Sequence, residues 1–196
     1  MRHYFDSKAE ETLEDPIELT YQYADMTFHL WSDKGVFSRQ HIDEASHLLM
    51  QSITPKAGDK LLDLGCGYGI IGLVMARYYG ADVSCVDVNP KAIALSKRNF
   101  KKYQLAANIV CADGLEPFEN TQFDWILSNP PIRIGKDKLY PLLVSAIEHL
   151  SEDGAFVFVM HKKHGVASAV RFLSDFASVK VLNKAKGFRV VACKKR

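Results

Sequence analysis

The stretch Lys60-Leu-Leu-Asp-Leu-Gly-Cys-Gly-Tyr-Gly-Ile70 decides the fold of this 196-residue chain. Residues 60–64 form a short apolar run, which predicts a buried strand. Glycines follow at positions 65, 67 and 69, and apolar residues then recur at helical spacing up to residue 79. Glycine lets a backbone turn sharply and pass close under a ligand at the carboxyl end of a strand. The stretch therefore predicts a strand, a ligand-binding loop and a helix.

The same alternation continues on the C-terminal side of this stretch. We predict strands over residues 60–64, 82–87, 107–111, 123–128 and 155–160, and helices over residues 70–79, 90–103, 140–150 and 166–176. Residues 178–184 and 188–193 are expected to form a closing hairpin that turns at Lys186-Gly187. Apolar strands that alternate with helices predict an α/β fold, with a mainly parallel seven-stranded sheet, helices on both faces and an antiparallel C-terminal strand.

The N-terminal side divides into three parts. Residues 1–18 are acidic and poor in apolar side chains, so we expect a loosely held arm. Residues 19–37 alternate between apolar and polar and break at Ala24-Asp25, which predicts a small hairpin. A helix over residues 39–53, capped by Ser38, then opens the core. The prediction is one domain over residues 19–196, with the hairpin at 19–37 and the core at 38–196.

Composition excludes several classes of protein. With 47% hydrophobic and 24% charged residues, the chain is expected to be one globular domain. No uncharged stretch approaches the roughly 20 apolar residues of a membrane span, and the first residues do not resemble a secretory signal. Cysteines 66, 85, 111 and 193 lie far apart without a C-x-x-C pair. We therefore expect reduced thiols in a cytoplasmic protein, and no disulfide or metal framework.

Charge is unevenly distributed along the chain. The net charge is −5 over residues 1–60, −1 over residues 61–130 and +8 over residues 131–196. The basic last third is open to two interpretations. It could bind a polyanion such as nucleic acid, or its lysines could solvate the outer faces of helices and a terminal strand.

Carboxylates follow the next two predicted strands. Asp87 ends the second strand, 24 residues after Asp63, and can accept both hydroxyls of a ribose. Asp113 follows the third strand and can accept a hydrogen bond from an adenine amino group. Strand ends at one edge of a parallel sheet converge on one crevice, so these acids should lie near the glycine loop. Ile70 stands where the dinucleotide fingerprint requires a third glycine, which disfavours a nicotinamide enzyme.

The fourth predicted strand delivers Asn129-Pro-Pro-Ile132 to the same edge. The prolines remove two backbone donors and fix φ, which leaves rigid carbonyl groups beside one side-chain amide. Such a site accepts both hydrogens of a planar amine and aims the nitrogen lone pair at an electrophile. No strong base is needed, because the nitrogen becomes acidic as it is alkylated. The motif therefore indicates transfer of a methyl group from an adenosine-bearing sulfonium.

These motifs resemble those of the class I S-adenosylmethionine-dependent methyltransferases that modify exocyclic nitrogens. The resemblance covers residues 20–196. Gly35-Val36-Phe37-Ser38 and the stretch from Pro130 to Lys136 narrow it to the small-domain family, which includes the ribosomal RNA guanine-N2 methyltransferases. It implies a Rossmann-like fold, S-adenosylmethionine as cofactor, and methyl transfer to guanine N2 in ribosomal RNA or a ribosomal subunit.

The resemblance also implies roles for particular residues. Cofactor-binding residues would be Phe37, Asp63, Gly65, Cys66, Gly67, Gly69, Asp87, Val88, Asp113, Gly114 and Asn129. Catalytic residues would be Asn129, Pro130, Pro131 and Ile132. The candidates for RNA binding come from the basic last third of the chain and are Arg133, Lys136, Lys162 and Lys163. Many members carry Phe or Tyr where this chain has Ile132, and that ring stacks on the target base. Tyr68 or Phe37 would then have to supply the stacking ring.

Three other functions stay open at this point. The substrate could be a protein glutamine amide or adenine N6, although those relatives usually carry Tyr after the two prolines. The chain could be a non-catalytic nucleic-acid-binding module on the same fold, although the intact glycine loop and Asn129 argue against this. A nicotinamide dehydrogenase is disfavoured by Ile70. His161 and His164 have ligand-like spacing without an accompanying Cys or carboxylate pair, so no metal site is predicted.

Overall fold

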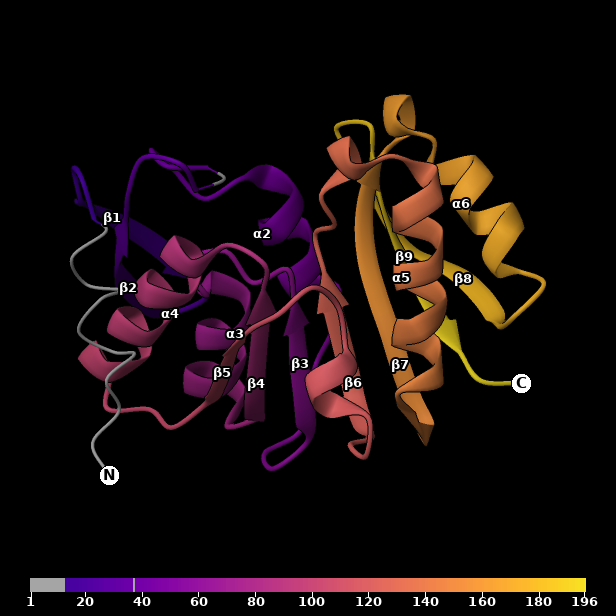
Figure 1. Cartoon of the computed structure of the whole chain (residues 1–196), viewed down its shortest axis with the longest axis horizontal. Coiled ribbons are helices and arrows are strands. Elements are labelled where there is room, and N and C mark those ends of the chain that lie inside the picture. The colour runs from indigo at the N-terminus through magenta and orange to yellow at the C-terminus, as the bar shows by residue number, and fades with distance from the viewer. Residues whose placement is uncertain (1–12, 37) are drawn as a thin grey trace.

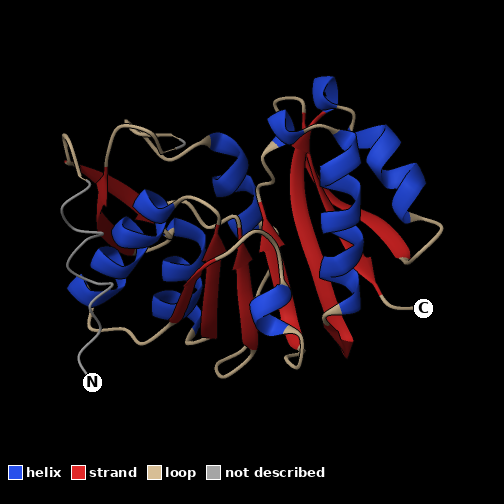
Figure 2. Ribbon diagram, viewed as in Figure 1, coloured by secondary structure: helices blue, strands red, loops and turns tan. Residues whose placement is uncertain are grey.

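A seven-stranded sheet runs through the centre of the structure, a computed structural model that describes residues 13–36 and 38–196 (Figures 1 and 2). The strands are β3 (Lys60–Leu64), β4 (Asp82–Asp87), β5 (Asn108–Cys111), β6 (Phe123–Ser128), β7 (Leu150–His161), β8 (Ser178–Ala185) and β9 (Phe188–Lys194). Their order is β5-β4-β3-β6-β7-β9-β8, with β9 antiparallel to both neighbours and the other pairs parallel. The predicted fold class is confirmed.

Helices cover both faces of this sheet. They are α2 (Glu44–Gln51), α3 (Ile70–Val74) with its π-helical continuation η1 (Met75–Tyr79), α4 (Pro90–Lys102), α5 (Lys136–Glu148) and α6 (Val166–Leu173). Buried residues of α2, α3 and α4 belong to one hydrophobic cluster, and those of α5 and α6 belong to another. Three 3-10 turns lie in the connections: η2 (Glu116–Phe118), η3 (Ile132–Ile134) and η4 (Lys162–His164).

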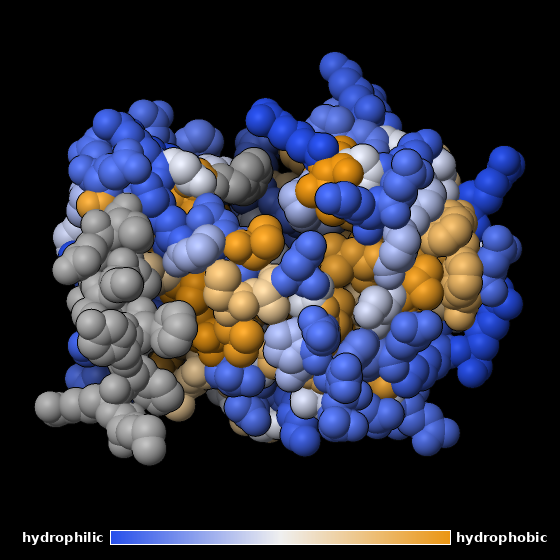
Figure 3. Space-filling view, in the orientation of Figure 1, coloured by the Kyte–Doolittle hydropathy of each residue, from blue (hydrophilic) through white to orange (hydrophobic). Residues whose placement is uncertain are grey.

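Strand β3 shows why the central strands appear in the sequence as continuous apolar runs. Leu61 packs in the cluster under α2, α3 and α4, whereas Leu62 and Leu64 pack in the cluster under α5 and α6. Successive side chains of a strand point to opposite faces, and here both faces are buried. In the orientation of Figure 1, apolar residues lie across the middle of the visible face and hydrophilic residues surround them (Figure 3). Among the described residues, no helix is long and apolar enough to cross a membrane.

The N-terminal hairpin packs on α4 through one buried amide. Its strands are β1 (Ile17–Tyr23) and β2 (Met26–Ser32), which pair antiparallel. The Trp31 N–H donates to Asn99 Oδ1 at 2.7 Å, and Asn99 Nδ2 donates to the carbonyl groups of Trp31 at 3.0 Å and Tyr68 at 2.8 Å. Asn99 thus connects the hairpin with the glycine loop after β3.

Three predicted element starts were wrong by four or five residues. Helix α2 begins at Glu44 rather than at 39, because Asp43 and not Ser38 caps it by accepting the N–H groups of Ala45 and Ser46. Helix α5 begins at residue 136 rather than at 140, so the charged residues 136–138 form its first turn. Strand β7 begins at residue 150 rather than at 155, because the polar residues 151–154 continue the strand beside an irregularity in its pairing with β6.

Residues 13–18 of the expected loose arm are held in place, and the rest of that arm, residues 1–12, lies outside the described residues. The buried Asp33 carboxylate accepts hydrogen bonds from the backbone N–H groups of Glu14 at 2.8 Å and Asp15 at 2.9 Å. Strand β1 already begins at Ile17. Burial opposes ionisation of Asp33, but its backbone hydrogen bonds outweigh burial and lower its pKa. The segment is therefore fixed to the loop that follows β2.

Candidate active site

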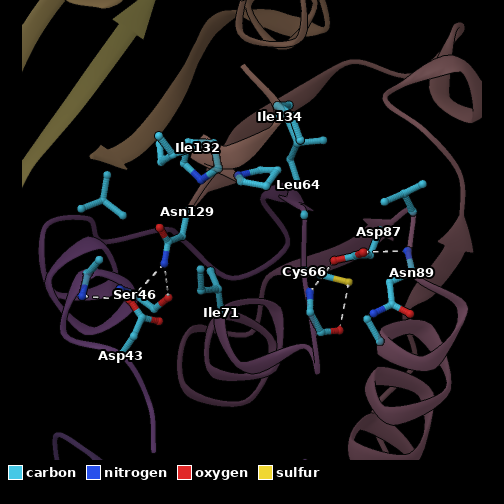
Figure 4. Close-up of a pocket in the computed structure, with 18 of the residues that line it drawn as sticks. Asp43, Ser46, Leu64, Cys66, Ile71, Asp87, Asn89, Asn129, Ile132 and Ile134 are labelled. Atoms are coloured by element: carbon cyan, nitrogen blue, oxygen red, sulfur yellow. Dashed lines mark hydrogen bonds between the residues drawn. The ribbon is translucent and has the colours of Figure 1, made fainter. Parts of the chain in front are cut away.

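A cavity of about 880 Å³ opens at the carboxyl ends of the parallel strands (Figure 4). The loops after β3, β4, β5 and β6 line it, together with the first turn of α2 and the ends of β7 and β9. Its volume lies in the upper part of the range of about 300–1,000 Å³ for small-molecule sites. As predicted, the ends of the parallel strands converge on one crevice.

Two of the three glycines after β3 face this cavity. Gly65 and Gly67 line it, have φ of +75° and +56°, and leave nothing within 4 Å of an added Cβ atom. The backbone at these positions is open to a ligand, and a side chain would occupy that space. Gly69 has a different role and does not line the cavity, because an added Cβ would lie 2.3 Å from the Ser96 hydroxyl of α4.

Asp87 holds the glycine loop and lines the cavity. Its Oδ2 accepts the Gly67 N–H at 2.9 Å, and its Oδ1 accepts the Asn89 N–H at 2.9 Å (Figure 4). A carboxylate oxygen can accept more than one hydrogen bond, so both oxygens retain capacity for ligand hydroxyl groups. The next residue, Val88, is 64% exposed and also lines the cavity, which gives the site an apolar surface beside the carboxylate.

Asp63 lies behind the glycine loop rather than in the cavity. Its side chain is fully buried; Oδ2 accepts the Gly72 N–H at 2.8 Å, and Oδ1 has no hydrogen-bond partner among the described residues. Burial raises the pKa of Asp63 to about 7, the Gly72 hydrogen bond opposes this, and nearby Asp87 adds to it. Asp63, expected to bind the cofactor, does not line the cavity, and its one hydrogen bond holds Gly72 of α3.

The other predicted cofactor residues mostly line the cavity. Cys66, Asp113 and Gly114 do so, and Phe37 lies outside the described residues. A hydrogen bond with Cys85 and burial raise the pKa of the Cys66 thiol, so this thiol stays neutral. A neutral thiol is a poor nucleophile, which argues against covalent chemistry at Cys66. Cys66, Cys85 and Cys193 are buried and unpaired, whereas Cys111 is exposed.

Asn129 occupies the end of β6 with its amide held from one side. Its Nδ2 donates to Asp43 Oδ1 at 3.0 Å and to Ser46 Oγ at 3.1 Å. Figure 4 shows Nδ2 on the side of Asp43 and Ser46, with Oδ1 turned toward Ile132. Pro130, Pro131 and Ile132 line the cavity beside it, as predicted. The amide oxygen is thus the acceptor that Asn129 presents here.

Sequence reasoning missed Asp43 and Ser46. Both line the cavity and both contact Asn129, although they precede it by 86 and 83 residues. An aspartate just before an apolar run is a typical helix start, so this signal could have identified Asp43 as the cap. Nothing local in the sequence indicates that the same carboxylate reaches Asn129.

Of the four basic residues expected to bind RNA, one lines the cavity and three lie on segments next to it in the chain. Arg133 is exposed and lines it. Lys136, Lys162 and Lys163 are exposed outside the lining, and the Lys136 ammonium lies 3.5 Å from the Ser168 hydroxyl of α6. The four residues belong to η3, α5 and η4, which adjoin the lining residues Ile134, His161 and His164 in the chain.

Aromatic rings line the cavity near the end of β7. His161 meets Phe188 edge to face at 4.9 Å and lies 5.6 Å from His164, measured between ring centroids. All three residues line the cavity, and so does Tyr68, which is only 4% exposed. Within residues 13–36 and 38–196, no three side chains of His, Cys, Asp or Glu are grouped to hold a metal ion. The two histidines therefore belong to the cavity wall.

Comparison with known proteins finds one family model and several relatives that match most of the chain. The sequence model of the methyltransferase small domain matches residues 27–192. The chain is 33% identical over 198 residues to a Bacillus subtilis protein named uncharacterized protein YbxB, covering 98% of both chains. It is 30% identical over 181 residues to ribosomal RNA small subunit methyltransferase C of Haemophilus influenzae, covering 89% of this chain and 54% of that protein. The chain thus spans about half the length of the relatives with that name.

A solved structure gives the same result. The T. thermophilus 16S rRNA N2 G1207 methyltransferase (RsmC), in complex with AdoMet and guanosine, superimposes with a TM-score of 0.84 and 25% identity. The match covers 93% of this chain and 51% of that one. With the glycine loop, Asp87 and Asn129 around one cavity, these matches confirm the expected family. The chain belongs to the methyltransferase small-domain family, a family of S-adenosylmethionine-dependent methyltransferases.

Proposed function

We propose that this protein transfers the methyl group of S-adenosylmethionine to the N2 amine of a guanine in ribosomal RNA. The observation that carries the proposal is the position of Asn129. Its amide oxygen lies at the end of β6, in the same cavity as the glycine loop and Asp87. The relatives named as ribosomal RNA methyltransferases, one of them solved with AdoMet and guanosine, support this substrate class.

The cavity fits the cofactor at both of its polar ends. Gly65 and Gly67 leave open space where a side chain would lie, so the methionine part can approach the backbone. The Asp87 carboxylate would accept a hydrogen bond from each of the two ribose hydroxyl groups while it continues to hold the glycine loop. Val88 would contact the adenine ring, and the Asp113 carboxylate would accept a hydrogen bond from the adenine amino group. Bound there, S-adenosylmethionine supplies an electrophilic methyl group on a positively charged sulfur.

Asn129 and Pro130 would orient the target amine. The Asn129 amide oxygen and the Pro130 carbonyl accept the two N–H hydrogens, which turns the nitrogen lone pair toward the methyl group. The nitrogen–methyl bond forms as the sulfur–methyl bond breaks, and the nitrogen then loses a proton to solvent. Because alkylation makes that proton acidic, the site does not need a strong base. Most of the rate enhancement would come from alignment of the two reactants.

Basic side chains around the opening would hold the RNA. Arg133 lines the cavity, and Lys136, Lys162 and Lys163 are exposed on neighbouring segments. Their charges would bind backbone phosphates while the base leaves the helix and enters the cavity. Ile132 has no aromatic ring that could stack on that base. The rings of His161 and Phe188 line the cavity and would contact the base instead.

The test is transfer of labelled methyl from S-adenosylmethionine to unmodified ribosomal RNA and ribosomal subunits, followed by nucleoside analysis. Label is expected in N2-methylguanosine. The variant Asn129→Ala should lower turnover at least about hundredfold and leave cofactor affinity nearly unchanged. The exposed Asn120 lies outside the cavity lining, so Asn120→Ala is the matched control.

The outcomes separate the alternatives. Label in N6-methyladenosine, or in glutamine residues of a protein, would keep the chemistry and replace the substrate. Cofactor binding without transfer to any fraction would favour the non-catalytic module. Wild-type turnover by Asn129→Ala would remove Asn129 from the reaction.

A further inference from the structure

We infer that Asp43 and Ser46 form a clamp that sets which end of the Asn129 amide faces the substrate. The clamp is the pair of hydrogen bonds from Asn129 Nδ2 to Asp43 Oδ1 at 3.0 Å and to Ser46 Oγ at 3.1 Å. Asp43 and Ser46 are positioning residues, because they act on the target amine through Asn129. The inference rests on the proposed function, in which the Asn129 oxygen accepts a hydrogen from that amine.

The clamp matters because an asparagine amide has two orientations of nearly equal shape. Rotation by 180° about the last side-chain bond exchanges the oxygen and the NH₂ group. An oxygen at the cavity can accept a hydrogen from an amine, whereas an NH₂ group would place donor against donor. Only one of the two orientations therefore supports the proposed reaction.

Asp43 is the member of the pair that selects the orientation. An ionised carboxylate only accepts hydrogen bonds, so it attracts the NH₂ group and repels the amide oxygen. The Ser46 hydroxyl can donate or accept, so it can bond with either end of the amide. Without Asp43, the Asn129 amide should consequently lose its preference for one orientation. Without Ser46, this preference should only become weaker.

The clamp is rigid because the start of α2 holds it. The same Asp43 Oδ1 accepts the N–H groups of Ala45 and Ser46, both at 3.0 Å, and so caps the helix. Ser46 is 4% exposed, so its hydroxyl meets Asn129 inside the protein rather than at the surface. Helix α2 packs against β7, the strand next to β6. The cap of one helix thereby fixes a side chain at the end of a distant strand.

Kinetic measurements on Asp43→Ser test this role. Serine is also a good N-cap, so the variant keeps a cap for α2 while it removes the carboxylate and shortens the reach toward Asn129. We expect kcat for methyl transfer to ribosomal RNA to fall at least about tenfold, with the Kd for S-adenosylmethionine and the KM for RNA within about twofold. Asp43→Asn retains an amide oxygen that can accept from Asn129, so it should recover most of the lost turnover.

Serine variants on the same helix provide the matched pair. Ser46→Ala should lower kcat by about two- to fivefold, because Asp43 remains. Ser52 follows α2 and donates to the Leu48 carbonyl at 2.6 Å, outside the cavity lining. Ser52→Ala should therefore leave kcat unchanged, and an equal loss in both variants would assign the effect to the stability of α2.

NMR of side-chain amides tests the clamp without any substrate. The Asn129 NH₂ signal, identified by its absence in Asn129→Asp, should exchange with solvent at least about tenfold more slowly than that of the exposed Asn120. In Asp43→Ser this protection should disappear. Equal exchange of Asn129 and Asn120 in the wild type would overturn the inference.

The two kinds of measurement keep the clamp and the proposed function apart. If the wild-type protein methylates no ribosomal RNA, the proposed function fails, and the exchange of the Asn129 amide still decides whether the clamp exists. If Asp43→Ser loses the protection but keeps wild-type kcat, the clamp has no positioning role. If Asp43→Ser does not fold, the kcat of Ser46→Ala and the exchange rate of the Asn129 amide in the wild type decide whether the clamp exists and acts on turnover.

Discussion

Asp63 makes the stability of this protein depend on pH in an unusual direction. The carboxyl group is fully buried behind the glycine loop, and only one of its oxygens has a hydrogen-bond partner among the described residues. Burial raises its pKa to about 7, against an ordinary value of 3.8. We expect Asp63→Asn, which keeps an oxygen for the Gly72 N–H but carries no charge, to become more stable relative to wild type as pH rises.

The magnitude follows from the two pKa values. Because the folded state binds the proton more tightly than the unfolded state, the stabilising effect of the proton is fully present below pH 3.8 and is lost as pH rises through about 7. At pH 5, two units below the folded pKa, this effect is about 3 kcal/mol, since each unit corresponds to about 1.4 kcal/mol. At pH 8 almost none remains. Between pH 5 and pH 8 the variant should therefore gain about 2–3 kcal/mol relative to wild type.

Urea unfolding at pH 5, 6, 7 and 8 measures this difference. The fluorescence of Trp31 and Trp125, which are both partly buried, reports unfolding. Asp82→Asn is the control, because Asp82 is an exposed carboxylate on the neighbouring strand β4. A difference between Asp63→Asn and wild type that stays constant across this pH range would show that Asp63 is charged throughout, and the reasoning from burial would be refuted.

Three further predictions concern the loop, the cofactor and the RNA. Asp87→Ala should raise the Kd for S-adenosylmethionine about tenfold or more in calorimetry, and an unchanged Kd would remove Asp87 from the ribose site. Gly69→Ala should lower the free energy of unfolding by about 1–3 kcal/mol, because φ is +86° and the new Cβ would lie 2.3 Å from the Ser96 hydroxyl; an unchanged melting temperature would contradict this. Replacing Lys162 and Lys163 with Glu should weaken ribosomal RNA binding and flatten its dependence on salt, by about one unit of slope for each phosphate that a lysine no longer neutralises. An unchanged slope in a salt titration would place the RNA elsewhere.

The sequence predicted the central strands well because burial on both faces makes them visible. Strands β3, β4 and β6 have the expected bounds, since each is an apolar run that ends in glycine or a polar residue. The start of β7 was missed because residues 151–154 are polar and include a glycine, which is typical of a turn. They belong to β7 because Leu150 pairs with Phe123 and Ala155 pairs with Trp125, so residues 151–154 span the irregularity between these two pairs, which leaves no local signal.

The candidate site was predictable where it depends on strand ends. Gly65, Asp87 and Asn129 follow three parallel strands, so topology alone brings them to one cavity. Asp43 was missed because the predicted helix began too early, and its contact with Asn129 depends on how α2 packs. In the sequence, His161 is notable only for its ligand-like spacing from His164. Its packing against Phe188 of β9 could not be inferred from sequence.

The position of β6 in the sheet also affects how the chain folds during synthesis. Strand β3 pairs with β4 on one side and with β6 on the other, and Leu61 of β3 lies opposite Trp125 of β6. Until residues 123–128 leave the ribosome, the nascent half-sheet β5-β4-β3 therefore presents an unpaired apolar edge, which is prone to aggregation. Asn129 follows β6 directly. Pairing of β6 therefore covers the edge of β3 and brings Asn129 to the site in the same folding event, so the chain does not pass through a stage in which this edge is covered but Asn129 is still missing.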